Sequence, residues 1–248
     1  MARPAAKQEL EEHMHPWEHP LIGKGMRAQL ETRRARLAQG GERLGWKVGL
    51  GAPASMQKLG ISAPAVGFLM RSGVLPSGAT VSLKDYTRPV AEAEICVRMA
   101  RDLGGEAAAE DALGAIASIE PAIELADLDP VPAPDNLDVV LSGNIYHRHV
   151  ILGLNTRTGG ALDGIVSRVT RRGLEFNRTT DPQALTGKMT DIVAYVARLL
   201  AAFGETLKAG DIVITGSITA PVLLEADETA FAHALDPIGE VRVAFTRD

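Results

Sequence analysis

The sequence lacks the features of secreted and membrane-spanning proteins. Its single cysteine, Cys96, excludes a disulfide within the chain, and this is compatible with a reducing cytoplasm. No run approaches the roughly 18 consecutive apolar residues of a transmembrane helix. The charged segment 1–12 also lacks the apolar stretch of a secretory signal. We therefore expect a soluble, globular, cytoplasmic protein.

The chain also lacks a net positive charge and has few aromatic residues. The formal net charge is −5, so we expect no strong attraction to nucleic acid or to an anionic membrane. An aromatic content of 4% argues against a stacking surface for single-stranded nucleic acid. The chain has no phosphate-binding glycine loop, no Gly-x-Ser-x-Gly turn and no Cys-x-x-Cys pair. Its 248 residues suit one large domain, with or without a small appendage.

The most informative stretch is residues 89–99, where apolar and charged residues alternate with the period of a β-strand. This period places Glu92 and Glu94 side by side on one face of the strand. Two neighbouring carboxylates raise each other's pKa unless a cation lies between them. A hard divalent cation such as Mg2+ accepts such oxygen ligands. The alternative is an ordinary solvated strand face.

A third acid follows on a second predicted strand, 118–127, where Pro121 excludes the interior of a helix. Glu120 and Glu124 share one face of this strand, so Glu124 is available to meet Glu92 and Glu94. Three carboxylates with open positions for water and substrate match the preferences of Mg2+ or Mn2+. Cys96 shares the face of the first two glutamates, but the sequence places no base beside it to activate the thiol.

Lys47 lies between Gly45 and Gly49 on a predicted strand over 44–50. Flanking glycines allow a neighbour or ligand to approach the backbone closely. Such a lysine beside a metal site could bind an anionic substrate, and the alternative is an ordinary exposed lysine. The small-residue loop 216–221 follows a buried strand, 212–215, and can offer N–H groups and hydroxyls to a carboxylate.

Two groups of histidines are weaker candidates. His13, His15 and His19 with Glu18 could ligate a metal, but Pro16 and Pro20 break the register that would align them, and a mobile arm is favoured.

In the second group, His147 and His149 alternate, so they share a face if this stretch is a strand. They are either catalytic or metal-binding residues or partly exposed surface residues.

The remaining pattern predicts four helices and several strands. A solvated amphipathic helix is expected over 26–38, ending at Gly40 and Gly41. The helix over 190–203 has the clearest apolar spacing. The other predicted elements are helices at 54–59 and 106–116, strands at 67–70, 80–83, 228–235 and 240–245, and a hairpin over 161–178.

The order of these motifs resembles the fumarylacetoacetate hydrolase superfamily, and within it the branch of 2-keto-4-pentenoate (2-hydroxypenta-2,4-dienoate) hydratases and 4-oxalocrotonate decarboxylases. The resemblance covers about residues 26–246. The motifs that carry it are Gly-Trp-Lys-Val-Gly-Leu (45–50), Leu-Gly-Ile (59–61), Gly-Phe-Leu (67–69), Ala-Glu-Ala-Glu-Ile (91–95), Pro-Ala-Ile-Glu (121–124), residues 207–217 and Ile-Gly-Glu-Val (238–241).

This resemblance implies an α+β fold, a mixed β-roll with flanking helices. A metal-binding catalytic domain over 44–248 would follow an N-terminal arm and helix over 1–43. The resemblance also implies a homo-oligomer, in which a related hydratase or decarboxylase can associate. It assigns Mg2+ or Mn2+ to Glu92, Glu94 and Glu124, the metal chelating a 2-keto acid, and a catalytic role to Lys47. The implied substrate contacts are Leu50, Gly216, Ser217 and Thr219.

The chain departs from the pattern of that branch in three places. Ala65 follows Pro64 where the hydratases usually carry an acid. The stretch 142–147 replaces a more polar loop. Residues 187–191, Gly-Lys-Met-Thr-Asp, replace Gly-His-Pro-x-x-Ala. These changes indicate a different pocket wall or reaction, in which His147, His149 or Lys188 could take over a role.

We therefore expect a metal-dependent lyase that acts on a 2-keto or dienol acid in aromatic catabolism, with hydration as the first hypothesis. The alternatives are a decarboxylase, a C–C hydrolase such as acylpyruvate hydrolase, and a non-catalytic accessory subunit, which the loss of the acid at Ala65 favours. The C–C hydrolases carry His-x-x-Glu soon after the first strand, and residues 55–58 contain no histidine, which disfavours hydrolysis.

Overall fold

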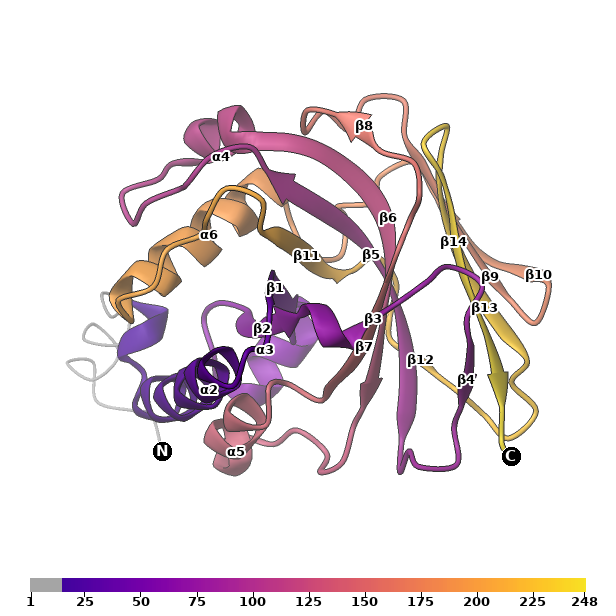
Figure 1. Cartoon of the computed structure of the whole chain (residues 1–248), viewed down its shortest axis with the longest axis horizontal. Helices are drawn as coiled ribbons and strands as arrows, with labels where there is room; N and C mark the ends of the chain where they lie inside the picture. Colours follow the sequence, from indigo (N-terminus) through magenta and orange to yellow (C-terminus); the bar gives the residue numbers. More distant parts are fainter. Residues whose placement is uncertain (1–14) are drawn as a thin grey trace, which may run out of the picture.

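The computed structural model describes residues 15–248 and confirms an α+β fold built on a mixed, curled β-roll (Figure 1). A nine-stranded sheet curls between a group of helices on one side and a five-stranded sheet on the other. The α-helices are α2 (Pro20–Ala38), α3 (Pro53–Leu59), α4 (Ala109–Ala115), α5 (Leu137–Ser142) and α6 (Met189–Ala202). In the described part of the chain, no helix is both long and apolar enough to cross a membrane.

The nine-stranded sheet holds every strand that the motifs predicted near the site. Its main path runs β2 (Ala65–Met70), β1 (Arg43–Gly49), β11 (Ile212–Ser217), β5 (Pro89–Met99), β6 (Ile116–Asp127), β7 (His147–Leu152) and β3 (Val74–Leu75). Two short strands lie off this path, β12 (Val222–Leu223) on β5 and β8 (Arg157–Thr158) on β6. The β1–β11 and β3–β7 pairs are parallel and the other pairs are antiparallel, so the sheet is mixed.

The five-stranded sheet runs β10 (Leu174–Thr179), β9 (Val166–Arg171), β13 (Ala230–Asp236), β14 (Gly239–Thr246) and β4 (Thr80–Ser82). Its inner face packs on β5, β6 and β7 through one apolar layer, which includes Ala91, Ala93 and Phe231. Because side chains alternate along a strand, this packing turns Glu92 and Glu94 to the opposite face of β5.

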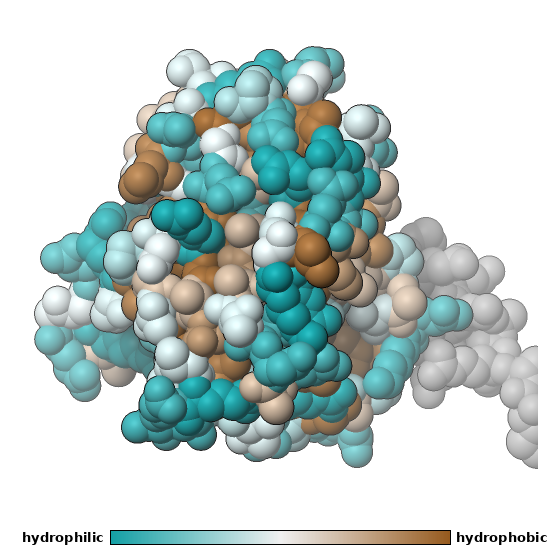
Figure 2. Space-filling model, turned by 90° about the vertical axis from the view of Figure 1, so that its right-hand side faces the viewer, coloured by the Kyte–Doolittle hydropathy of each residue, from teal (hydrophilic) through white to brown (hydrophobic). Residues whose placement is uncertain are grey.

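The outer face of the five-stranded sheet is mixed in character. Figure 2 shows pale and brown residues near its middle, with hydrophilic residues around them. A shallow groove on this sheet is lined by small side chains, Ala230, Ala232 and Ala244, together with Thr170 and Arg242.

Helix α6 closes the other side of the large sheet, and its apolar stripe is buried as predicted. Helix α2 differs from the prediction because it begins at Pro20 and is not a solvated helix. Its polar residues Gln29 and Arg33 are buried. Gln29 donates to the Val66 and Leu141 carbonyls, and Arg33 pairs with Glu205 at 3.1 Å. These partners compensate part of the burial of polar groups that the sequence pattern predicted to be solvated, while Gln29 Oε1 and Arg33 Nε have no partner among the described residues. The division of the chain at residue 43 stays a prediction.

Candidate metal centre and substrate pocket

Three glutamates meet where β5 and β6 pair. Glu92 lies directly opposite Glu124 in the register of this pair, and Glu94 is two residues further along β5. One carboxylate oxygen from each of the three lies within 4.8 Å of the others. Glu94 and Glu124 are fully buried and Glu92 is partly exposed, so the alternative of a solvated strand face is wrong. Within residues 15–248, this is the one cluster of three or more candidate metal ligands.

In each of the two buried glutamates, one carboxylate oxygen accepts hydrogen bonds and the other has no partner among the described residues. Glu124 Oε1 accepts from Lys47 Nζ at 2.5 Å and from His147 Nδ1 at 2.7 Å, while Glu124 Oε2 has no hydrogen-bond partner among the described residues. Glu94 Oε2 accepts from the Gly216 N–H at 2.7 Å, and Glu94 Oε1 has no such partner. Buried carboxylate oxygens without partners are costly, and a hard divalent cation is the ligand they suit. The donor set therefore fits Mg2+ or Mn2+.

The electrostatics of the cluster agree with this fit. Burial, together with the nearby Glu124 carboxylate, raises the pKa of Glu92 to about 7. Burial also raises the pKa of Glu94, and both other glutamates add to the rise. Burial alone would raise the pKa of Glu124, but Lys47 and His147 outweigh it and hold that pKa below its usual value. Glu124 is thus an anion already, while Glu92 and Glu94 need a further cation to ionise fully.

Lys47 is buried on β1, so the alternative of an ordinary exposed lysine is wrong. Its Nζ donates to Glu124 Oε1 and, at 3.0 Å, to the carbonyl of Ile145. An ammonium group has three donors, so one N–H remains. Lys47 also lines the cavity beside the triad, and this N–H is available to a ligand there.

The Ile145 carbonyl is presented by an unusual turn. Asn144, Ile145 and Tyr146 all have left-handed backbones, with φ of 60°, 50° and 63°. Such a conformation is costly for a β-branched residue such as isoleucine. The Asn144 side chain secures the turn, because it accepts from the Phe68 N–H and donates to the Phe68 carbonyl on β2.

The cavity has a volume of about 190 Å3, below the range of roughly 300–1,000 Å3 for drug-sized ligands, and so suits a small acid. Four predicted substrate contacts line it, namely Leu50, Gly216, Ser217 and Thr219. The buried Ser217 hydroxyl has no partner among the described side chains and backbone groups. Gly216 has a φ of +96°, and a Cβ there would lie 3.0 Å from Thr186 Cγ2, so both backbone and space require glycine.

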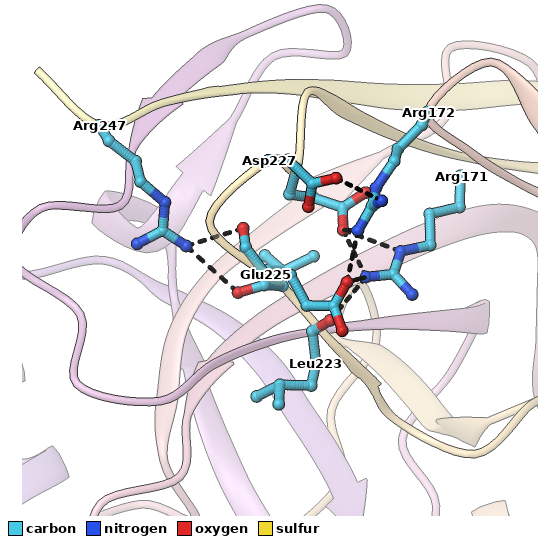
Figure 3. Close-up of polar contacts among 8 residues, drawn as sticks. Arg171, Arg172, Leu223, Glu225, Asp227 and Arg247 are labelled. Atoms are coloured by element: carbon cyan, nitrogen blue, oxygen red, sulfur yellow. Dashed lines mark hydrogen bonds and ion pairs between the residues drawn. The ribbon is translucent and has the colours of Figure 1, made fainter.

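The loop that carries Thr219 is anchored at its far end (Figure 3). Beyond the pocket it forms β12 on β5, next to Glu92. An ionic cluster then holds residues 223–228 against the β9–β10 turn. Arg172 bonds to Glu225 at 2.6 Å and to Asp227 at 2.7 Å, and Arg171 bonds to the buried Glu228 at 2.8 Å. The loop therefore has fixed points on both sides of Thr219 and Pro221.

The candidates raised by the departures from the hydratase pattern lie in different places. His147 does not line the pocket but supports Glu124 from behind, and His149 lines a separate cavity there with His147. Lys188 is exposed at the start of α6 and lies outside the pocket lining. Ala65 is buried at the start of β2, next to Pro64, which lines the pocket. Alanine therefore leaves this wall without a carboxylate.

The remaining reactive candidates do not join the site. Cys96 is buried beside Glu120, and burial raises the pKa of its thiol well above the usual value, so the thiolate is disfavoured. His13 lies outside the described residues. The ring of His15 stacks on Trp17, and Glu18 accepts from the backbone of His15.

Several pocket residues were not singled out from the sequence. They are Ser55, Leu128, Pro132, Tyr146, Leu185 and Thr186. Leu185 and Thr186 come just before the divergent stretch 187–191, none of whose residues lines the pocket. Asn144 after Gly143 was a local signal for a left-handed turn, because asparagine tolerates that conformation.

The mixed β-roll, the carboxylate triad and the lysine beside it define a class of metal-binding β-roll proteins. Within that class, the chain belongs to the Fumarylacetoacetate (FAA) hydrolase C-terminal family, whose sequence pattern matches residues 46–246. The resemblance read from the motifs is thereby confirmed.

Similar proteins include both members of the expected branch. The 2-keto-4-pentenoate hydratase of Burkholderia vietnamiensis is 32% identical over 220 residues, which cover 83% of this chain and 79% of the relative. The 2-hydroxyhexa-2,4-dienoate hydratase of Comamonas testosteroni is 27% identical over 88% of this chain and 83% of its own length. The structure of 4-oxalocrotonate decarboxylase from Pseudomonas putida G7, complexed with magnesium and adipate, matches with a TM-score of 0.81 at 25% identity, covering 97% of this chain and 94% of that chain.

Proposed function

We propose that this chain is a divalent-metal-dependent lyase that acts on a 2-keto or dienol acid, as a hydratase in the first instance. The observation that carries the proposal is the meeting of three groups at one pocket. These are the glutamate triad, the remaining N–H of Lys47 and the unpartnered hydroxyl of Ser217. Within the triad, Glu92 lines the pocket, and Glu94 and Glu124 each have an oxygen without a described partner. Together they can hold a cation and a small carboxylic acid and can move a proton.

Glu92, Glu94 and Glu124 would hold Mg2+ or Mn2+. When bound, the cation polarises the 2-keto group and stabilises negative charge that develops on its oxygen. Lys47 holds a proton at Nζ beside the substrate, while Gly216, Ser217 and Thr219 orient the carboxylate. In a hydration, the hydroxyl of water bonds to one alkene carbon and a proton bonds to its neighbour, so no oxidant or reductant is needed.

Decarboxylation is the second candidate, supported by the similarity to 4-oxalocrotonate decarboxylase over nearly the whole chain. The same site serves it, because loss of CO2 beside a carbonyl also leaves negative charge on the keto oxygen.

One assay separates these reactions. The purified full chain with Mg2+ or Mn2+ is incubated with 2-hydroxypenta-2,4-dienoate and, separately, with 4-oxalocrotonate. Dienol absorbance and CO2 release are followed, with Lys47→Met as the inactive control. Dienoate decay without CO2 supports the hydratase, and CO2 release from 4-oxalocrotonate supports the decarboxylase. Decay of neither, together with tight binding of oxalate or pyruvate, would contradict catalysis and favour an accessory binding subunit.

We also propose that the enzyme works in the cytoplasm as a homo-oligomer, which can associate with a related hydratase or decarboxylase. The single, buried cysteine supports a reducing compartment, and the family resemblance supports assembly. Sedimentation of the purified chain and cell fractionation test these two points.

A further inference from the structure

The pocket is unusually poor in charge for a site that takes organic acids. Of the twenty residues between 15 and 248 that line it, two carry a charge, Lys47 and Glu92. Glu92 belongs to the triad. Lys47 already donates to Glu124 and to a backbone carbonyl. The described wall therefore offers no cation to a second acidic group on the ligand.

The rest of the wall is apolar or neutral. Apolar side chains dominate it, including Leu50, Pro64, Leu128, Pro132 and Leu185. The neutral polar groups include the hydroxyls of Ser55, Tyr146 and Thr186. The Tyr146 hydroxyl is buried without a partner among the described residues, and burial raises its pKa to about 12, so it stays an uncharged donor. Such a wall suits an aliphatic or alkenyl tail.

We propose that this pocket selects 2-keto acids with one carboxylate and an uncharged tail, and that it rejects 2-keto dicarboxylates. The inference rests on the proposed function, because the triad is taken to bind the 2-keto acid end. A distal carboxylate would then be buried against leucine and proline with no cation to replace its hydration. A methyl or vinyl end at the same place instead gains from leaving water.

The test uses ligand pairs of equal length. 2-Oxopentanoate and 2-oxoglutarate have the same five carbons and differ in a terminal methyl group or carboxylate. Titration calorimetry of the Mg2+-loaded full chain should show at least about 100-fold tighter binding of 2-oxopentanoate. Along the series 2-oxobutanoate, 2-oxopentanoate and 2-oxohexanoate, affinity should rise about fourfold per methylene until the cavity is filled.

A variant that adds a cation to the pocket wall tests the same inference from the opposite direction. Leu128 and Leu185 are both half-buried, so an arginine there can reach water and the chain still folds. Leu128→Arg should strengthen 2-oxoglutarate binding at least tenfold and weaken 2-oxopentanoate binding. Leu154→Arg is the matched control, because Leu154 is 87% exposed and lies outside the pocket lining, and it should change neither affinity.

The outcomes separate this inference from the proposed function. Preference for 2-oxopentanoate without turnover of either 2-hydroxypenta-2,4-dienoate or 4-oxalocrotonate supports the inference and contradicts the lyase. Because 4-oxalocrotonate is itself a 2-keto dicarboxylate, its efficient turnover would overturn the inference and leave the lyase in place. Binding of 2-oxoglutarate within tenfold of 2-oxopentanoate, with no gain from Leu128→Arg, overturns the inference whether or not the enzyme turns over.

Discussion

Glu94→Gln tests the metal centre most directly. Glu94 is fully buried, one of its oxygens accepts from Gly216, and the other has no described partner. Glutamine keeps the shape of the side chain and can keep the bond to Gly216, but it removes the charge. We therefore expect the metal-free variant to be as stable as the wild type at pH 8 or more stable, because burial and the two neighbouring glutamates disfavour the wild-type carboxylate.

The stabilisation by Mg2+, in contrast, should be smaller in Glu94→Gln than in the wild type. At a free concentration of one hundred times Kd, binding to the folded state alone adds about 2.7 kcal/mol to the free energy of unfolding. For a chain of this length, each kcal/mol corresponds to about 2–4 °C. The wild type should therefore gain about 5–10 °C in Tm, whereas Glu94→Gln should gain less than about 2 °C.

Glu120→Gln is the matched control. Glu120 is also buried on β6, four residues before Glu124, but it pairs with Arg98 at 3.0 Å outside the triad. This variant should lose some stability and keep the full Mg2+ response. The measurement is differential scanning fluorimetry with EDTA and with a Mg2+ series. An unchanged Mg2+ response in Glu94→Gln, or an equal loss in Glu120→Gln, would show that the triad is not the metal site.

Three further predictions follow from the same contacts. Lys47→Met should lower kcat about 10²–10⁴-fold in steady-state assays. It should still show a Mg2+ shift in Tm, since the ammonium group is not a metal ligand and His147 still bonds to Glu124; complete loss of that shift would contradict the assignment. Asn144→Ala should lower the free energy of unfolding in urea by about 1–3 kcal/mol, because it leaves the buried Phe68 N–H and carbonyl unpaired; no loss would mean that the turn is held in another way. The metal-free protein should lose stability as pH rises. The pKa of Glu92 is near 7 in the folded chain, against 4.5 in the unfolded chain. The folded state therefore binds this proton more tightly, and the stabilisation that results is fully present below pH 4.5 and is lost as the pH rises through 7. That loss, at most about 3 kcal/mol for this group, is measurable by urea unfolding in EDTA at pH 5 and 8, and a rise with pH would refute it.

The sequence predicted the glutamates well because a strand has a fixed period. Whatever packs on β5, Glu92 and Glu94 share a face, and Pro121 marks the strand that carries Glu124. The register that places Glu92 opposite Glu124 depends on pairing between distant segments, so no local pattern determines it. The resemblance of the motifs supplied that step.

The burial of Lys47 could not be read from its neighbours. Glycines on both sides were compatible with an exposed lysine as well as with a buried one. The decision depends on strand order, because β11 alone separates β1 from β5 and brings Lys47 within reach of Glu124. The left-handed turn was harder still to predict, because isoleucine and tyrosine rarely adopt positive φ. The contacts that stabilise it, from Asn144 to Phe68 and from Lys47 to the Ile145 carbonyl, join segments far apart in the sequence.

The charges of the site also link the binding of its metal to the binding of its small acid. Without a metal, burial and the neighbouring acids raise the pKa values of Glu92 and Glu94 and favour their neutral forms, while Lys47 offsets the charge of Glu124. A divalent cation at the triad would displace these protons and give a 2-keto acid a positive charge to bind. We therefore expect the small acid to bind more tightly to the metal-loaded chain. The bond from Lys47 to Glu124 has a second purpose in this scheme, since it keeps that glutamate ionised and leaves Oε2 ready as a ligand.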